Sequence, residues 1–263
     1  MTEKRSPALV ELQGIGKAFP TESGQRVWVI RDISLAIKQG ELITVVGPSG
    51  SGKSTLLRLI AGILDASEGS VVFDGRRVAG PSRERVMIFQ NSEAALFEWL
   101  TAAQNVEFGL RSAGMPRRSR AERGREVLEL VGLGSHAEKH PSQLSGGMQQ
   151  RLQIARAIAV RPKLLLLDEP LAALDAQTRR ILLRELVKLW AETESTFVYV
   201  THDIREAALL GGRIVVVSRG PSATVREVLV NAEPYPRDEF SSGFASLCKA
   251  IDASLTAEVG EEL

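Results

Sequence analysis

The residues that decide the fold are Gly47-Pro-Ser-Gly-Ser-Gly-Lys53-Ser54. They follow an apolar run, Leu42–Val46, and precede a helical pattern over Thr55–Ala61. They match the pattern G-x-x-x-x-G-K-[ST], in which glycine permits dihedral angles that turn backbone N–H groups onto phosphate oxygens. The match predicts a strand, a phosphate-binding loop and a helix, in that order.

Each part of this loop has an expected role. The Lys53 ammonium would reach the β- and γ-phosphates of ATP, and the Ser54 hydroxyl would bind Mg²⁺. The alternative is a plain glycine turn, but a chance match occurs in roughly one chain in a hundred of this length. The candidate nucleotide-binding residues are therefore Gly47, Pro48, Ser49, Gly50, Ser51, Gly52, Lys53, Ser54 and Thr55.

Short apolar runs recur downstream and are nearly continuous rather than alternating, which is typical of parallel strands buried on both faces. They are Val86–Phe89, Leu164–Leu167, Phe197–Val200 and Ile214–Val217. Four other runs, in the N-terminal part of the chain, are short and separated by turns, which predicts an antiparallel patch. These are Leu9–Gln13, Val27–Ile30, Ile33–Ile37 and Val71–Phe73. Residues 91–160 read as helical, with breaks at Pro116 and Gly124, and the tail after Pro221 reads as irregular.

Composition excludes several classes of protein. The 263 residues carry 33 Lys and Arg against 32 Asp and Glu, a net charge of +1 that names no partner. The single cysteine, Cys248, fits a reducing compartment, and no apolar run reaches the roughly 18 residues of a membrane span. Six arginines lie between Arg111 and Arg125 without interleaved aromatics, which favours a solvated helical face over a nucleic-acid site.

An acidic pair ends one of the buried strands, in Leu164-Leu-Leu-Leu-Asp168-Glu169-Pro170. Ligands of open α/β sheets bind at this end of the strands. Asp168 would hold Mg²⁺ through its water shell, and Glu169 would act as the general base on the attacking water. A helix N-cap is the alternative for such a pair.

A second anion site is predicted at Leu144-Ser-Gly-Gly-Met-Gln-Gln-Arg151. A Ser-Gly-Gly step that opens a helix exposes N–H groups at the positive end of the helix dipole. One chain then has two phosphate sites of different design, which predicts a nucleotide held between two copies of the protein.

Together these segments resemble the ATP-binding subunit of an ABC transporter. The resemblance covers about residues 9–220 and rests on Gly47–Thr55, Gln90, Leu144–Arg151, Leu164–Pro170, Asp175 and His202. It implies an ATPase with an α/β fold: a P-loop NTPase (RecA-like) core, an N-terminal antiparallel β patch and an α-helical subdomain inserted over about 91–160. Residues 221–263 would then be a short extension without a regulatory domain.

The resemblance also assigns roles to single residues. Gln90 would touch Mg²⁺ and water and face the membrane partner, Asp175 would lie at the dimer seam, and His202 would contact the γ-phosphate. The signature residues Ser145, Gly146, Gly147 and Gln149 would contact the nucleotide of the other copy. Phe19 would stack on adenine, with Trp28 as its rival and burial in the core as the alternative.

Two positions depart from the family pattern. Met148 stands where Gln is common, and its spacing to Leu152 and Ala155 suits the packed face of the helix. Ala172 stands where many relatives have Ser, which weakens the trans contact expected of that segment. His136 and His140 lack any such context and are expected to be structural.

The sequence around Gln90, together with Phe97-Glu-Trp99-Leu, most resembles that of the nitrate, sulfonate and taurine importer group. The implied partners are transmembrane permease subunits, a second copy or close paralogue, and indirectly a periplasmic solute-binding protein, but no nucleic acid. Phe97 and Trp99 would suit the permease docking surface, with core burial as the alternative. The implied location is peripheral, on the cytoplasmic face of the inner membrane. The alternatives are an exporter or lipid-trafficking ATPase, and a soluble ABC ATPase acting on nucleic acid or ribosomes.

Overall fold

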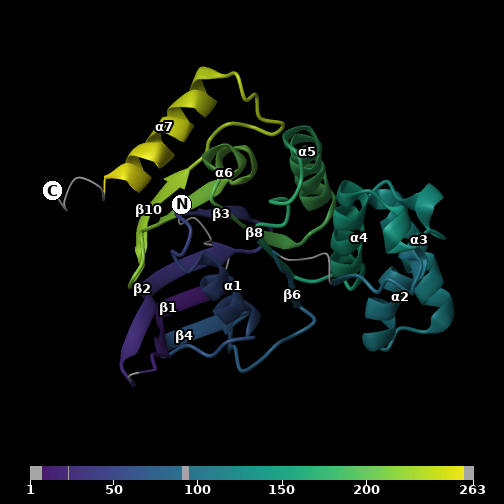
Figure 1. Ribbon diagram of the computed structural model, residues 1–263, viewed down its shortest axis with the longest axis horizontal. Coiled ribbons are helices and arrows are strands. Elements are labelled where there is room, and N and C mark those ends of the chain that lie inside the picture. The colour runs from purple at the N-terminus through teal and green to yellow at the C-terminus, as the bar shows by residue number, and fades with distance from the viewer. Residues whose placement is uncertain (1–7, 23, 91–94, 258–263) are drawn as a thin grey trace, which may run out of the picture. The chain divides into compact units, whose positions relative to one another are not determined.

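The computed structural model describes residues 8–22, 24–90 and 95–257 (Figure 1). They form two compact units. The first unit comprises Met1–Ser82 with Thr196–Leu263, and the second comprises Arg83–Ser195. The first four residues of the predicted helical segment, 91–94, lie outside the described residues.

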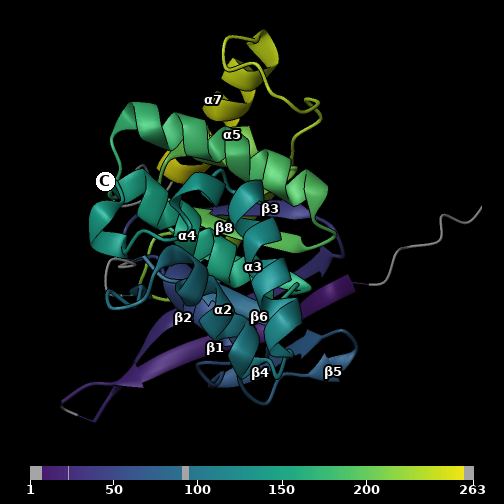
Figure 2. The same cartoon turned by 90° about the vertical axis from the view of Figure 1, so that its right-hand side faces the viewer.

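An antiparallel sheet occupies the N-terminal part of the first unit (Figure 2). Its strands are β1 (Ala8–Pro20), β2 (Arg26–Lys38), β4 (Glu68–Phe73) and β5 (Arg76–Arg77), in the order β2-β1-β4-β5. Val10, Leu12, Ile15, Ile33 and Ile37 are buried on it. The predicted antiparallel patch is confirmed.

One detail of that patch was wrong, because Val27–Ile30 and Ile33–Ile37 are parts of the single strand β2. The register between β1 and β2 shifts between the pairs Ile15–Ile33 and Lys17–Ile30. Asp32 takes a φ of 49° within this shift. An extra residue of this kind is a β-bulge, which bends a strand without ending it. The polar Arg31-Asp32 step therefore marks a bulge and not a turn.

The second sheet of the first unit carries the phosphate loop. Its strands are β3 (Leu42–Val46), β8 (Thr196–Thr201), β9 (Arg213–Val217) and β10 (Val225–Val230). β3 lies between β8 and β9 and is parallel to both, and β10 is antiparallel to β9. Every residue of β3 and β8 is buried, as their continuous apolar sequences predict. Helices α1 (Lys53–Ala61) and α6 (Ile204–Leu210) follow β3 and β8.

The sequence pattern indicated an irregular tail after Pro221, and this prediction was wrong. The tail forms β10 and the helix α7 (Ser242–Thr256), which contacts α6, β9 and β10 (Figure 1). The Ser241 hydroxyl caps α7 by accepting from the N–H of Phe244. Phe244 and Ile251 are buried, so α7 packs against α6, β9 and β10 through one narrow apolar face.

The second unit combines two parallel strands with helices. The strands are β6 (Arg85–Ile88) and β7 (Leu164–Asp168). The α-helices are α2 (Ala102–Ser112), α3 (Arg117–Leu130), α4 (Gly146–Ala159) and α5 (Ala176–Glu192), with 3-10 turns at Gly134–His136 and Pro141–Gln143. Helices α2, α3 and α4 contact one another, as the predicted helical segment requires.

Gly124 does not break a helix, contrary to the sequence prediction. Pro116 precedes the first residue of α3, but Gly124 lies inside α3 and is buried. A Cβ there would lie 3.5 Å from Cγ of Glu107 on α2. Gly124 therefore lies where α3 packs against α2, and the contacts of α3 with α2 and α4 outweigh the low helix propensity of one glycine. Arg117, Arg118 and Arg125 of the same helix are exposed, as expected for a solvated face.

Candidate nucleotide-binding site

The phosphate loop joins the end of β3 to the start of α1. Gly52 is the N-cap of α1, with a φ of 80°, and no side chain caps this helix end. The first-turn N–H groups of a helix lack partners within the helix and bind anions. The loop and helix therefore present the backbone donors that a triphosphate requires.

Two glycines of the loop are required by close contact, and Gly52 is also required by its φ of 80°. A Cβ on Gly47 would lie 2.8 Å from the carbonyl oxygen of Val217. A Cβ on Gly52 would lie 2.5 Å from Cγ2 of Ile30, which belongs to β2. The loop is thus fixed against both sheets of the first unit.

Lys53 is folded back onto its own loop. Its side chain is 5% exposed, and Nζ donates to the carbonyl oxygens of Gly47 and Pro48, each at 2.8 Å. Ser51 Oγ lies 3.5 Å from Nζ. An ammonium group has three donors, so these carbonyls hold the charge within the loop where the sequence places the phosphates.

His202 lies at the same edge of the sheet as the loop. Thr201, the last residue of β8, is paired in register with Val46, the last residue of β3. Gly47 and His202 therefore leave neighbouring parallel strands at their carboxyl ends, where ligands of such sheets bind. The His202 side chain is exposed.

The acidic pair ends β7 in the second unit. Asp168 is 2% exposed, and Glu169 takes a φ of 43°. Non-glycine residues rarely adopt this region, and such strain concentrates at functional sites. The helix-cap alternative does not apply to α5, because Asp175 is its N-cap.

Gln90 and Glu169 are in contact in the second unit. Gln90 Nε2 donates a hydrogen bond of 3.1 Å to Glu169 Oε2. Gln90 follows β6 by two positions and Glu169 follows β7 directly, and these strands are parallel neighbours. The fold therefore brings together two predicted catalytic residues that lie 79 positions apart.

The signature forms a helix start, as predicted. Ser145 is the N-cap of α4, and its Oγ accepts from the N–H of Met148 at 3.4 Å. A Cβ on Gly147 would lie 2.8 Å from Cγ2 of Thr178 on α5. Gln149 Nε2 donates to the carbonyl oxygens of Pro141 and Leu144, so this side chain holds the segment that precedes the signature.

Asp175 caps the helix that follows the acidic pair. Its Oδ1 accepts from the N–H groups of Gln177 and Thr178 at 3.1 and 3.0 Å. The hydrogen bond from the Thr178 backbone is the main cause that lowers the pKa of this exposed carboxyl group. The residue expected at a dimer seam therefore also has a local structural role.

The two candidate adenine platforms differ in their surroundings. Phe19 is 40% exposed, and Lys17 Nζ lies 5.2 Å from its ring centre. Trp28 is half-buried, with its ring at Gly16, where a Cβ would lie 2.8 Å from Cζ3. The Arg31 guanidinium lies 4.9 Å from the Trp28 ring centre. Phe19 is the more accessible of the two platforms.

An aromatic cluster lies beyond β6 in the second unit. The ring of Phe97 is 5.5 Å from that of Trp99 and 4.5 Å from that of Phe108. Trp99 is 74% exposed and Phe108 44% exposed, whereas Phe97 is half-buried. An exposed patch of this kind suits a protein partner.

Sequence reasoning gave Asn105 no role, yet this residue organises that cluster. Asn105 is fully buried. Its Oδ1 accepts from the N–H of Phe97, and its Nδ2 donates to the carbonyl oxygens of Phe97, Leu100 and Thr101. Asn105 belongs to the stretch that resembles the importer group, but the sequence gives no signal of this structural role, because its partners are backbone atoms.

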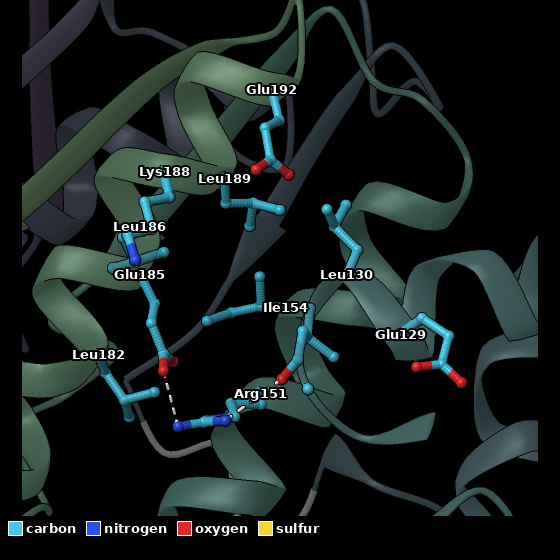
Figure 3. Close-up of a pocket in the computed structure, with 12 residues that line it drawn as sticks. Glu129, Leu130, Arg151, Ile154, Leu182, Glu185, Leu186, Lys188, Leu189 and Glu192 are labelled. Carbon is cyan, nitrogen blue, oxygen red and sulfur yellow. Dashed lines mark hydrogen bonds and ion pairs between the residues drawn. The ribbon is translucent and has the colours of Figure 1, made fainter. Parts of the chain in front are cut away.

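The second unit also has a groove of about 270 Å³. Leu182, Leu186 and Leu189 of α5 line it opposite Ile154 of α4 (Figure 3). No residue assigned to nucleotide, metal or catalysis lines it. An ion pair of 2.8 Å between Arg151 and Glu185 lies at its edge, so the last signature residue ties α4 to α5.

The donor set suits a Mg²⁺–ATP ligand. Ser54 of the first unit offers a hydroxyl oxygen and Asp168 of the second unit a carboxylate oxygen, and each is a ligand type that Mg²⁺ prefers when phosphates complete its shell. Within the described residues, no group of three or more His, Cys, Asp or Glu could hold a metal by itself. In the same part of the chain, no helix has the length and apolarity to cross a membrane.

The fold and these motifs define the P-loop nucleotide-binding class, with an added antiparallel sheet and helical segment. The family model described as "ABC transporter" matches residues 30–172. The chain therefore belongs to the ABC transporter ATP-binding family and is an ATPase of that family.

Three curated relatives support this membership. An uncharacterized ABC transporter ATP-binding protein, MJ0412 of Methanocaldococcus jannaschii, is 41% identical over 98% of this chain and 96% of its own length. The nitrate import ATP-binding protein NrtD of Synechococcus elongatus is 44% identical, over 85% of this chain and 81% of its own. The taurine import ATP-binding protein TauB of Roseobacter denitrificans is 41% identical, over 83% and 81%.

A solved structure agrees with the fold. The ATP-binding cassette MJ0796, described as a dimeric post-hydrolysis state bound to ADP and Pi, has a TM-score of 0.71 and 33% identity. The match covers 87% of this chain and 99% of that one. The expected P-loop NTPase core with its β patch and helical subdomain is thereby confirmed.

Proposed function

We propose that this chain is the ATP-hydrolysing subunit of a bacterial importer of a small anionic solute of the nitrate, sulfonate or taurine type. Family membership supports the ATPase part, and the nitrate and taurine relatives support import. Residues 9–220 form the ATP-binding domain in this proposal, with the helical subdomain over about 91–160, and 221–263 form an extension. Its place is on the cytoplasmic face of the inner membrane, held by the permease.

In the proposed cycle, two copies, or one copy and a paralogue, enclose two ATP molecules head to tail. Lys53 and His202 of one copy hold the γ-phosphate, and Ser145 with the Gly146 and Gly147 amides of the other complete its binding. This closed state is favoured by ATP because only there is the γ-phosphate contacted from both sides. The dimeric MJ0796 cassette supports such an assembly.

Hydrolysis is assigned to Glu169. The single observation that supports this most is the contact of 3.1 Å between Gln90 and Glu169, with the strained backbone of Glu169. The carboxylate accepts a proton from the attacking water, and the Gln90 amide orients that carboxylate. Ser54, Asp168 and Gln90 would hold Mg²⁺, which when bound supplies positive charge that stabilises the phosphates.

Docking of the permease is assigned to the aromatic cluster of Phe97, Trp99 and Phe108. Trp99 is the most exposed of the three, and aromatic side chains dominate the energetics of protein interfaces. The cluster begins seven residues after Gln90 in the sequence. A partner bound to this cluster would therefore contact a segment that closely follows Gln90, the residue that contacts Glu169.

Transport in vesicles tests the proposal. The chain would be purified with its permease subunits and reconstituted with ATP inside, and the matching solute-binding protein would be added outside with labelled nitrate or taurine. We expect ATP-dependent accumulation of one of these anions, and none with Glu169→Gln. Outward movement of the solute, or uptake that continues with Glu169→Gln, would contradict the assignment.

A further inference from the structure

The segment after β10 returns to helix α6 and binds its C-terminal end. Asn231 Nδ2 donates to the carbonyl oxygen of Ala208 at 2.8 Å. Arg237 Nη1 donates to the carbonyl oxygens of Ala208 and Leu209 at 3.0 and 2.8 Å. The Tyr235 hydroxyl donates to the carbonyl oxygen of Leu210. The last carbonyls of a helix have no partners within the helix, so this segment supplies them.

Arg237 is the central residue of this contact. Its side chain is 7% exposed, and its guanidinium lies 4.0 Å from the Tyr235 ring centre. A positive charge at a helix C-terminus also complements the helix dipole. Arg237 therefore combines charge, directed hydrogen bonds and burial at one end of α6.

The same segment also contacts the N-terminal turn of α6. Arg205 Nη2 lies 3.4 Å from Glu239 Oε2, and its guanidinium lies 5.5 Å from the ring centre of Phe244 in α7. Phe244 is 2% exposed. Figure 1 shows α7 lying beside α6, and contacts between the two helices agree. Both ends of α6 are therefore held by residues 231–244.

The first turn of α6 is tied to the residues on either side of His202. Glu206 is 7% exposed, and its Oε2 accepts from the hydroxyls of Tyr199 and Thr201 at 2.9 and 2.8 Å. Thr201 Oγ1 accepts from the N–H of Asp203 at 3.0 Å. His202 lies between Thr201 and Asp203, so the position of its backbone follows that of α6.

We propose that residues 231–256 act as a brace on α6, with Arg237 as the positioning residue that keeps His202 in place for ATP hydrolysis. Helix α6 has 7 residues, which is too short to be stable without tertiary contacts. The brace supplies such contacts at both ends. The inference rests on the role proposed for His202.

Kinetics of single variants in the full chain test the brace. Because a displacement of about 1 Å can cost roughly a hundredfold in rate, we expect Arg237→Ala to lower kcat by about tenfold. KM for ATP should change less than about twofold, and Arg237→Lys should recover part of the loss. Tyr235→Phe, which removes one hydroxyl and keeps the ring, should lower kcat by about threefold and covers the case in which Arg237→Ala fails to fold. Lys249→Ala, an exposed site on α7, is the matched control and should match the wild type.

Two readouts separate positioning from general damage. Hydrogen exchange of the backbone amides of residues 202–210 should become at least about tenfold faster in Arg237→Ala and in Tyr235→Phe, with β3 and α1 unchanged. Adding Arg237→Ala to His202→Ala should cause little further loss of kcat, because both changes remove the same contribution.

The outcomes distinguish the brace from the role of His202. If His202→Ala leaves kcat unchanged, the role proposed for His202 is wrong, whatever the exchange data show. If His202→Ala lowers kcat, while Arg237→Ala and Tyr235→Phe change neither kcat nor exchange in α6, the brace is wrong. Equal fold losses from Arg237→Ala in the wild-type and His202→Ala backgrounds would also overturn it, because the effect would not pass through His202.

Discussion

The Gln90 side-chain amide donates to the Glu169 carboxylate across 3.1 Å. A hydrogen bond from an amide to one carboxylate oxygen restrains the orientation of the carboxylate group. A general base needs this orientation toward the water from which it takes the proton. The contact therefore connects the residue assigned to catalysis with Gln90, which lies seven positions before Phe97 in the sequence.

Replacing the carboxylate should separate binding from hydrolysis. In Glu169→Gln the side chain keeps its size but loses the basic group, so we expect kcat to fall by about 100- to 10,000-fold. The affinity for ATP should stay within about twofold. Steady-state phosphate release measures the first value, and equilibrium binding of labelled ATP measures the second.

The Glu169→Gln variant should accumulate the closed dimer, which size-exclusion chromatography in the presence of ATP detects. Gln90→Ala is the comparison, because it removes the orienting amide and leaves the base. We expect a smaller loss of kcat from it than from Glu169→Gln. Rapid phosphate release by Glu169→Gln would show that another group acts as the base.

The ammonium of Lys53 should contribute to ATP affinity. It now donates to Gly47 and Pro48 at 2.8 Å, and phosphate oxygens would offer it charged acceptors. Hydrogen bonds to charged groups contribute about 1.5–3 kcal/mol, so Lys53→Ala should weaken ATP binding by roughly 10- to 150-fold. Isothermal titration with ATP and with adenosine gives the test. If Lys53→Ala weakened adenosine binding by the same factor as ATP binding, the lost contact would not be one to the phosphates.

A bulky charge at the signature should prevent closure without affecting ATP binding within one copy. Ser145 is the exposed N-cap of α4, so Ser145→Arg places a large cation where the other copy's nucleotide is expected. We expect no ATP-dependent dimer in Ser145→Arg combined with Glu169→Gln, with ATP affinity within about threefold. Met148→Leu in the same background should still dimerise, because this change roughly conserves volume. A dimer of the Ser145→Arg form on size exclusion would exclude the trans role.

The adenine platform can be tested by comparing its two candidates. Base stacking on an aromatic ring contributes about 1–3 kcal/mol. Phe19→Ala should therefore weaken ATP binding by roughly 5- to 150-fold, with Phe19→Tyr close to wild type. Trp28→Ala should instead lower the thermal unfolding midpoint, because its ring is at Gly16. The reverse pattern in binding titrations and thermal melts would assign the platform to Trp28.

Local motifs in the sequence carried most of the fold and the candidate site. The phosphate loop was readable because a buried strand, glycines and Lys53 stand next to one another. Contacts between distant segments were not readable in this way. Gln90 and Glu169 are 79 positions apart, and no local pattern in either segment predicts a contact with the other. The position of Glu169 at a strand end indicated its role, the resemblance to a family supplied the role of Gln90, and the fold supplied their contact.

The tail escaped prediction for a different physical reason. Strand β10 exposes much of its surface, including Val230 at 73%, so no apolar face stands out in its sequence. Helix α7 buries only a narrow face that includes Phe244 and Ile251. Arg237, buried and bonded to backbone carbonyls, looks in sequence like a surface charge. Sequence patterns report burial of apolar side chains, whereas this segment is held largely by polar contacts.

The cap at Asp175 should make part of the stability depend on pH. Backbone N–H groups of Thr178 and Gln177 donate to its carboxylate, which lowers the pKa in the folded state. A lowered folded-state pKa means that the stabilisation is complete above the unfolded value, about 3.9, and is lost as pH falls through the folded value. Asp175→Asn keeps an N-cap acceptor without the charge.

We therefore expect the thermal midpoint of the wild type to approach or fall below that of Asp175→Asn as pH drops from about 6 to about 3. Thermal melts of both proteins across this range measure the difference, and other carboxyl groups cancel in it. A difference that stays constant with pH would show that the charge of Asp175 does not stabilise α5.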